Sequence, residues 1–152
     1  MSVTGTGTVN APVGAWVLAP ALAGRGEFTL NVQRAAGDPA PVGHATWVWV
    51  FGASRYEIAS TQVSQLLTGG AAARIDGACA INGVGGFHFT VLVVAARGPD
   101  GSDTQRLRLQ VRDAASGTVV LDTQPGTELT VDLETAGELA AGRITITGPA
   151  RD

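Results

Sequence analysis

RIDGACAINGVGGFHFTVLVV, residues 74–94, contains an Asn-Gly pair between two alternating apolar runs. A type I′ hairpin turn requires positive φ at both central residues, and Asn-Gly is the pair that adopts it most readily. The stretch therefore predicts a β-hairpin that turns at Asn82 and Gly83.

Two registers are open for this hairpin. A strict two-residue turn would place His88 on the same face as Cys79. A β-bulge at Gly85 and Gly86 would shift the register by one residue and bring Phe87 beside Cys79 instead. Paired glycines favour the bulge. We therefore expect Cys79 to be a small buried residue and His88 to point to the opposite face.

Alternation with a period of two recurs along the whole chain, while no segment keeps a 3.6-residue apolar period over three or four turns. Because the intervening loops are hairpin-sized, no helix is available to cover a parallel sheet. We expect one all-β domain over residues 1–152, an antiparallel β-sandwich of the Ig-like or jelly-roll-like kind with little or no helix. The expected strands are 3–9, 14–18, 27–34, 44–51, 54–59, 62–67, 72–81, 86–96, 104–113, 117–122, 127–133 and 142–147.

Two segments have other possible structures. Residues 134–142, ETAGELAAG, are the one place where a short helical turn fits the sequence. Residues 1–10, MSVTGTGTVN, are expected to form an extended N-terminal arm or an edge strand, and such an arm could add to the sheet edge of a neighbouring copy.

The charged residues exclude several classes of function. They make up 15% of the chain, the net charge is -3, and all 10 cationic residues are arginine. Without lysine, Schiff-base chemistry, pyridoxal anchoring and the P-loop lysine are excluded, and the acidic balance provides no basic field for nucleic acid. The chain contains no run of about 18 apolar residues, so membrane insertion is not predicted. Residues 1–10 lack the pattern of a signal peptide.

Few residues are candidates for chemistry. Cys79 has neither a cationic neighbour nor a helix N-terminus to activate it. His44 and His88 could be combined with Ser60 or Ser64, but the chain has no G-x-S-x-G motif. We expect no catalytic residue and no cofactor.

A calcium site is a further candidate, in the loop GPDGSD at residues 98–103. Asp100 and Asp103 offer carboxylate oxygens, which calcium prefers. The loop lacks the D-x-D-x-D-G spacing and the distal glutamate, so an ordinary Asp-Gly turn is the favoured interpretation.

Aromatic residues offer a possible ligand-binding surface. Trp47 and Trp49 share one face of the run HATWVWVF, residues 44–51, and could stack against a sugar if that face were open. The continuous apolar run favours burial of both rings. Trp16 and Tyr56 complete the set of aromatic ligand-binding candidates.

RLRLQVRD, residues 106–113, alternates apolar with polar residues. The two leucines and Val111 are expected to face the core. Arg106, Arg108 and Arg112 are expected to lie on a solvated face.

A set of turn and strand residues extends over most of the chain, over residues 5–147. It comprises the Pro-x-Gly-Ala-aromatic opening at Pro12 to Trp16, Ile81-Asn82-Gly83 followed by Gly86-Phe87 and Phe89, and the series Asp103, Arg106, Asp113, Gly117 and Asp122. In these residues the chain resembles a glycine-rich β-domain family of secreted bacterial multidomain proteins, which lies beside choice-of-anchor modules and sandwich repeats. The resemblance implies a non-catalytic module at an extracellular or cell-surface location.

The sequence as a whole predicts a non-catalytic structural or interaction domain, a subunit or module of an extracellular or particle-like assembly. Its expected partners are proteins, foremost other copies of the chain, because many short strands have edges that must be covered. A carbohydrate-binding module that uses the aromatic residues is the alternative.

Overall fold

The computed structural model describes residues 1–38, 40–97, 103–126, 129 and 138–148. These residues form nine strands and no helix, so none of them contributes a helix that could span a membrane. The strands are β1 (Ser2–Ala11), β2 (Gly24–Gln33), β3 (Val42–Phe51), β4 (Ser54–Gly69), β5 (Ala72–Ile81), β6 (Val84–Arg97), β7 (Asp103–Asp113), β8 (Val119–Asp122) and β9 (Leu139–Thr147).

All nine strands belong to one antiparallel sheet with the order β8-β7-β6-β5-β4-β3-β2-β1-β9. Every strand from β1 to β8 lies beside its neighbour in sequence, and β9 returns to pair with β1. The all-β, antiparallel prediction is confirmed. The prediction of a sandwich of two sheets is not confirmed, because the strands join into a single sheet that curls into a half-barrel.

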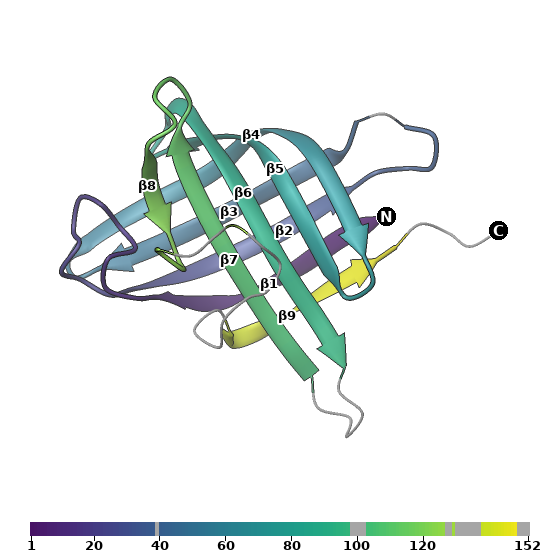
Figure 1. Ribbon diagram of the computed structural model, residues 1–152, viewed down its shortest axis with the longest axis horizontal. Coiled ribbons are helices and arrows are strands. Elements are labelled where there is room, and N and C mark those ends of the chain that lie inside the picture. The colour runs from purple at the N-terminus through teal and green to yellow at the C-terminus, as the bar shows by residue number, and fades with distance from the viewer. Residues whose placement is uncertain (39, 98–102, 127–128, 130–137, 149–152) are drawn as a thin grey trace.

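The curl begins in β4. The first part of β4, residues 54–59, pairs with β3, while the remainder pairs only with β5. Register shifts at Ser60/Gln62 and Val63/Gln65 bend the strand, as bulges do, and turn its second part away from β3. In consequence β6 and β7 cross over β1, β2 and β3 (Figure 1).

Both outer strands of the sheet have contacts beyond their ladder partners. Backbone hydrogen bonds join the β1–β2 loop to β8, from Val17 N to Val120 O at 3.1 Å and from Asp122 N to Ala15 O at 3.0 Å. On β9, Ile144 N donates to the side-chain oxygen of Gln105 on β7 at 2.7 Å. The curled sheet is thus held together near both of its edges.

Several strand predictions need correction. Residues 2–11 are neither an arm nor an edge strand, because β1 pairs with β2 on one side and β9 on the other. Residues 14–18 make one isolated bridge, Trp16 to Leu121, and 54–59 and 62–67 are parts of β4. Leu139 to Gly142 lie in β9, not in a helical turn. The expected strand at 127–133 lies, except for residue 129, outside the described residues.

The predicted hairpin is confirmed, bulge included. Asn82 and Gly83 have φ values of 49° and 80°, as a type I′ turn requires, and Gly86 has a φ of 97°. The register shifts between Cys79 and Ile81, so that Cys79 lies opposite Phe87. The bulge places the thiol on the inner face of the sheet.

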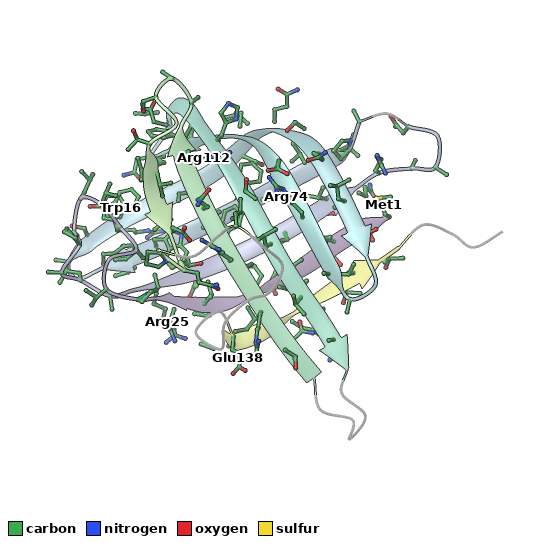
Figure 2. The ribbon with its side chains drawn as sticks, viewed as in Figure 1. Met1, Trp16, Arg25, Arg74, Arg112 and Glu138 are labelled. Atoms are coloured by element: carbon green, nitrogen blue, oxygen red, sulfur yellow. The ribbon has the colours of Figure 1, made fainter. Side chains whose placement is uncertain are left out.

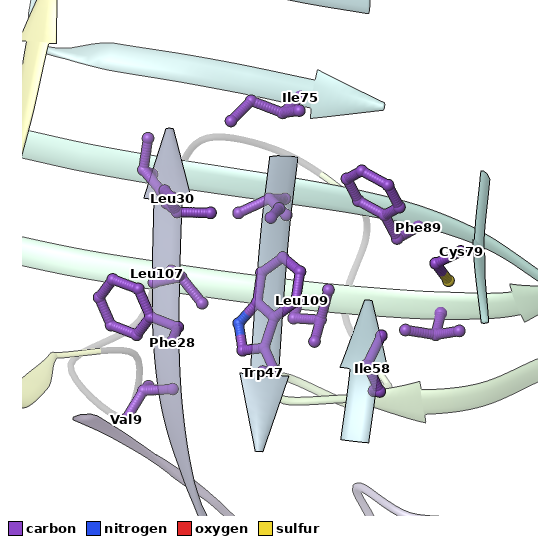
Figure 3. Packing of buried hydrophobic residues seen from close by; sticks show 14 of the residues in the cluster. Val9, Phe28, Leu30, Trp47, Ile58, Ile75, Cys79, Phe89, Leu107 and Leu109 are labelled. Carbon is purple, nitrogen blue, oxygen red and sulfur yellow. The ribbon is translucent and has the colours of Figure 1, made fainter. Parts of the chain in front are cut away.

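Aromatic and aliphatic side chains fill the interior of the curled sheet (Figure 3). Trp47 and Trp49 of β3 are 1% and 0% exposed, which confirms that both belong to the core. The Trp47 ring lies 6.1 Å from that of Phe89 on β6, centroid to centroid. A Cβ on Gly26 of β2 would lie 2.7 Å from the Trp49 ring, so only glycine leaves room for that indole.

The prediction of a solvated arginine face on β7 is wrong for Arg108, which is 0% exposed. Its Nε and Nη2 donate to the two carboxylate oxygens of Asp122 at 3.0 and 2.8 Å. Nη2 also donates to the backbone carbonyl of Gln124 at 3.0 Å. The segment that follows β8 therefore covers this position and fixes β8 to β7.

Candidate functional site

The thiol of Cys79 is buried in the core and 1% exposed. Burial disfavours the charged thiolate and raises the pKa of Cys79 to about 12. A protonated thiol without access to solvent is a poor nucleophile. Cys79 thus packs as a small apolar residue, as its sequence context predicts.

The two histidines lie on the outer surface, away from Cys79. His44 of β3 and His88 of β6 are exposed, and His88 Nδ1 lies 3.3 Å from the carbonyl oxygen of Gly77. The hydroxyl of Ser60 accepts a hydrogen bond from Ala45 N at 2.9 Å, and that of Ser64 donates to a backbone carbonyl. Within the described part of the chain, neither serine hydrogen-bonds a histidine.

The calcium candidates give no site that can be described. Asp100 lies outside the described residues, and Asp103 is the first residue of β7. The described residues hold no cluster of three or more acidic, histidine or cysteine side chains suited to a metal ion.

Of the four aromatic candidates, two come together. Trp47 and Trp49 are enclosed in the core and offer no open face to a sugar ring. Trp16, on the β1–β2 loop, packs against Tyr56 of β4 with 4.5 Å between ring centroids, and against Phe51 at 6.0 Å. Figure 2 shows Trp16 at the end of the molecule where the β1–β2 loop meets β8.

Beside Trp16 lies a hollow of about 340 Å³, which we name the apolar hollow. It is formed by the β1–β2 loop, β4, the β5–β6 hairpin and β8. Of the described residues that line it, none carries a formal charge, and Asn82 directs its side-chain oxygen to Glu57 N at 2.8 Å. The lining residues are Trp16, Val17, Leu18, Tyr56, Ile81, Asn82, Val84, Phe87 and Val120.

Two aliphatic side chains of the hollow project into solvent. Leu18 is 75% exposed and Val84 is 65% exposed, the largest exposed fractions among the large apolar residues of the described chain. Val17 is 48% exposed. A single exposed aliphatic residue is common on protein surfaces, but several that gather around a concave surface are typical of an interaction site.

The local sequence of the β1–β2 loop explains how Trp16 and Leu18 come to point in opposite directions. Consecutive tight turns close the loop, with hydrogen bonds from Ala15 N to Pro12 O and from Ala19 N to Trp16 O, each 3.1 Å long. The bridge to Leu121 of β8 holds Trp16 inward. The turn that follows then directs Leu18 outward.

Sequence reasoning identified Trp16 and Tyr56 but missed Leu18 and Val84. The composition of the β1–β2 loop could have indicated an apolar surface there. Loops are normally polar, but this one has no charged residue in residues 12–24, PVGAWVLAPALAG. Three other hollows bounded by described residues differ in character, since each has an arginine among its lining residues, namely Arg34, Arg25 and Arg143.

Comparison with known protein families, curated proteins and solved structures gave no match for this chain. The resemblance to the glycine-rich β-domain family therefore stays a prediction. The apolar hollow and its exposed rim are the basis on which a function can be argued.

Proposed function

We propose that this chain is a non-catalytic structural or interaction domain that binds a protein partner through the apolar hollow. The observation that carries the proposal is the exposure of Leu18 and Val84 around a concave surface with no charged lining residue. Such a surface is typical of a subunit or module of a larger assembly. The family resemblance implies an extracellular location.

Binding of a partner at the hollow is favoured because it removes exposed apolar area from water. Full burial of a valine or leucine side chain contributes about 1.5–3 kcal/mol. Leu18 and Val84 keep most of that area exposed in the isolated chain. A partner that covers both side chains gains roughly 1–2 kcal/mol from each, which is large for two contacts in an interface.

The reactive groups support a role other than catalysis. The Cys79 thiol is buried and protonated, and the Ser60 and Ser64 hydroxyls are engaged with backbone groups. The geometry also favours a protein partner over a sugar. Trp47 and Trp49 are enclosed, and Trp16 is only 3% exposed, so among the four candidates Tyr56 alone is not fully buried.

The test is a titration with the apolar dye 8-anilinonaphthalene-1-sulfonate, followed by its fluorescence. The wild-type protein is expected to bind the dye, and Leu18→Asp to weaken binding at least 5-fold, because a carboxylate would stand at the rim of the hollow. Leu67→Asp is the matched control, since Leu67 is 48% exposed on β4 and does not line the hollow.

Far-UV circular dichroism establishes that all variants keep the β-fold. No dye binding by the wild-type protein at a concentration where it is monomeric, or equal binding by Leu18→Asp, would overturn the proposal. Binding on a glycan array that Tyr56→Ala abolishes would replace it with the carbohydrate-binding alternative.

A further inference from the structure

We infer that the apolar hollow binds a second copy of this chain, with Leu18 of each copy inserted into the hollow of the other. The inference rests on the proposed function and names its partner. It is drawn from the shape, size, charge and area of the surface around Leu18 and Val84.

Shape is the first argument. A two-fold symmetric dimer uses the same patch on both copies, so the patch must fit itself. Here a protruding side chain and a concave site lie in one patch, because Leu18 is 75% exposed and also lines the hollow. A two-fold axis placed between Leu18 and the centre of the hollow would bring the Leu18 of each copy over the hollow of the other.

Size is the second argument. A buried apolar cavity of about 150 Å³ is enough for a benzene-sized group. The hollow measures about 340 Å³, and its lining residues include Trp16, Tyr56 and Phe87. It therefore has room for the Leu18 side chain of a second copy together with that of the adjacent Val17.

Charge is the third argument, because identical charges face each other across a two-fold axis. The described lining residues carry none. The charged residues on either side of Tyr56 in β4, Arg55 and Glu57, pair with each other at 3.2 Å. The nearest other carboxylate on the β6–β7 side is that of Asp113, which lies opposite Phe87 in the ladder and accepts hydrogen bonds from Ala115 N and Ser116 N. The lining itself therefore brings no like charges together across the axis.

Area sets the expected strength. The exposed fractions of Val17, Leu18 and Val84 correspond to roughly 300 Å² of accessible surface with backbone atoms included, at the lower end of the range for the largest apolar patch on a typical monomer. A standard interface buries about 800 Å² on each partner, so these residues would form its centre and not the whole of it. We expect a reversible dimer with a dissociation constant of roughly 1–100 μM.

Sedimentation velocity between 5 and 500 μM tests the inference. The wild-type mass is expected to rise with concentration from 15.4 kDa towards twice that value. Leu18→Asp and Val84→Asp are each expected to stay monomeric over the whole range. Leu67→Asp, the control outside the hollow, is expected to dimerise like the wild type, and circular dichroism shows that each variant is folded.

Crosslinking between two different variants tests whether Leu18 of each copy inserts into the hollow of the other. Leu18→Cys and Val84→Cys proteins are mixed and oxidised gently, and a disulfide between the two variants is expected because Leu18 of one copy reaches Val84 of the other. The native Cys79 is 1% exposed and does not compete. A Leu67→Cys protein mixed with Val84→Cys is the control and should give no such product.

A wild-type protein that stays monomeric at 500 μM would overturn the inference, as would a dimer that persists in Leu18→Asp. Dye binding then separates the two proposals. A monomer that binds the dye in a Leu18-dependent manner retains the proposed function with a different partner. A monomer that does not bind the dye disproves both.

Discussion

Replacing Asp122 by alanine removes the carboxylate that two nitrogens of Arg108 contact, at 3.0 and 2.8 Å. Arg108 is 0% exposed, so its guanidinium would lose the Asp122 carboxylate without gaining water. The same carboxylate accepts hydrogen bonds from Gln124 N at 2.9 Å and from the Gln110 side chain at 3.1 Å. We expect this substitution also to loosen β8, whose Val120 lines the apolar hollow.

The magnitude follows from the burial of the pair. Removing one partner of a buried ion pair costs about 3–5 kcal/mol, because an uncompensated charge remains in the interior. A domain of this size has a total free energy of unfolding of about 5–15 kcal/mol. Each kcal/mol lowers the Tm of a chain of 150–250 residues by roughly 2–4 °C, so Asp122→Ala should lower it by roughly 6–20 °C.

Urea unfolding followed by tryptophan fluorescence measures the effect. The double variant Arg108→Met/Asp122→Leu should be more stable than Asp122→Ala by at least about 1 kcal/mol, because it removes both charges and fills the site. Glu57→Gln is the control, since the Arg55–Glu57 pair is exposed and contributes about 0–1 kcal/mol. A loss below about 1 kcal/mol in Asp122→Ala, or a double variant no more stable than the single one, would refute the reasoning.

Four further predictions concern the core. The Cys79 thiol should resist iodoacetamide at pH 8 in the native protein and react in urea, and rapid native labelling would contradict its burial. The pKa of Cys79 is about 12 in the folded chain against 9.0 for an unperturbed thiol, so between pH 9 and 12 only the unfolded state releases the thiol proton. The free energy of unfolding should therefore fall as the pH rises over that range. A Cys79→Ala variant should lack this contribution. The emission of Trp16, Trp47 and Trp49 should be blue-shifted and resistant to iodide quenching, whereas red-shifted, quenchable emission would show that the rings are exposed. Gly26→Ala should lower the free energy of unfolding by about 1–3 kcal/mol in urea titrations, because a Cβ would meet the Trp49 ring, and an unchanged midpoint would show that the site has spare room.

Local patterns predicted most of the individual strands. The expected strand at 72–81 is found as Ala72–Ile81, and the one at 104–113 as Asp103–Asp113. The Asn82-Gly83 turn and the bulge after it were also predictable. In each case a few neighbouring residues suffice, because side-chain alternation and the φ preferences of Asn and Gly act along the backbone.

The number of sheets was not predictable in this way. The sequence favoured two strands at 54–59 and 62–67, and the structure contains one strand, β4, that bends there. Whether such an interruption is a turn or a bulge depends on the partners of the strand. Residues 54–59 pair with β3 and the rest with β5, and the pairing comes from segments distant in sequence.

The candidate site was predicted only in part. Trp16 and Tyr56 were recognised by residue type, since large aromatic rings are frequent in binding sites. Leu18 and Val84 were not, because an exposed aliphatic residue has the same sequence signature as a buried one. Their significance arises when four separate segments of the chain meet around the hollow.

Arg108 marks the boundary between what sequence and tertiary structure specify in this protein. The alternation in RLRLQVRD correctly placed Leu107, Leu109 and Val111 in the core and the arginines on the opposite side of the strand. Alternation fixes the side of the strand on which a residue lies, but not whether that side is covered. Burial of Arg108 results from the return of Asp122 to Gln124 over β7, a contact between segments more than ten residues apart that the backbone preferences of either one do not encode.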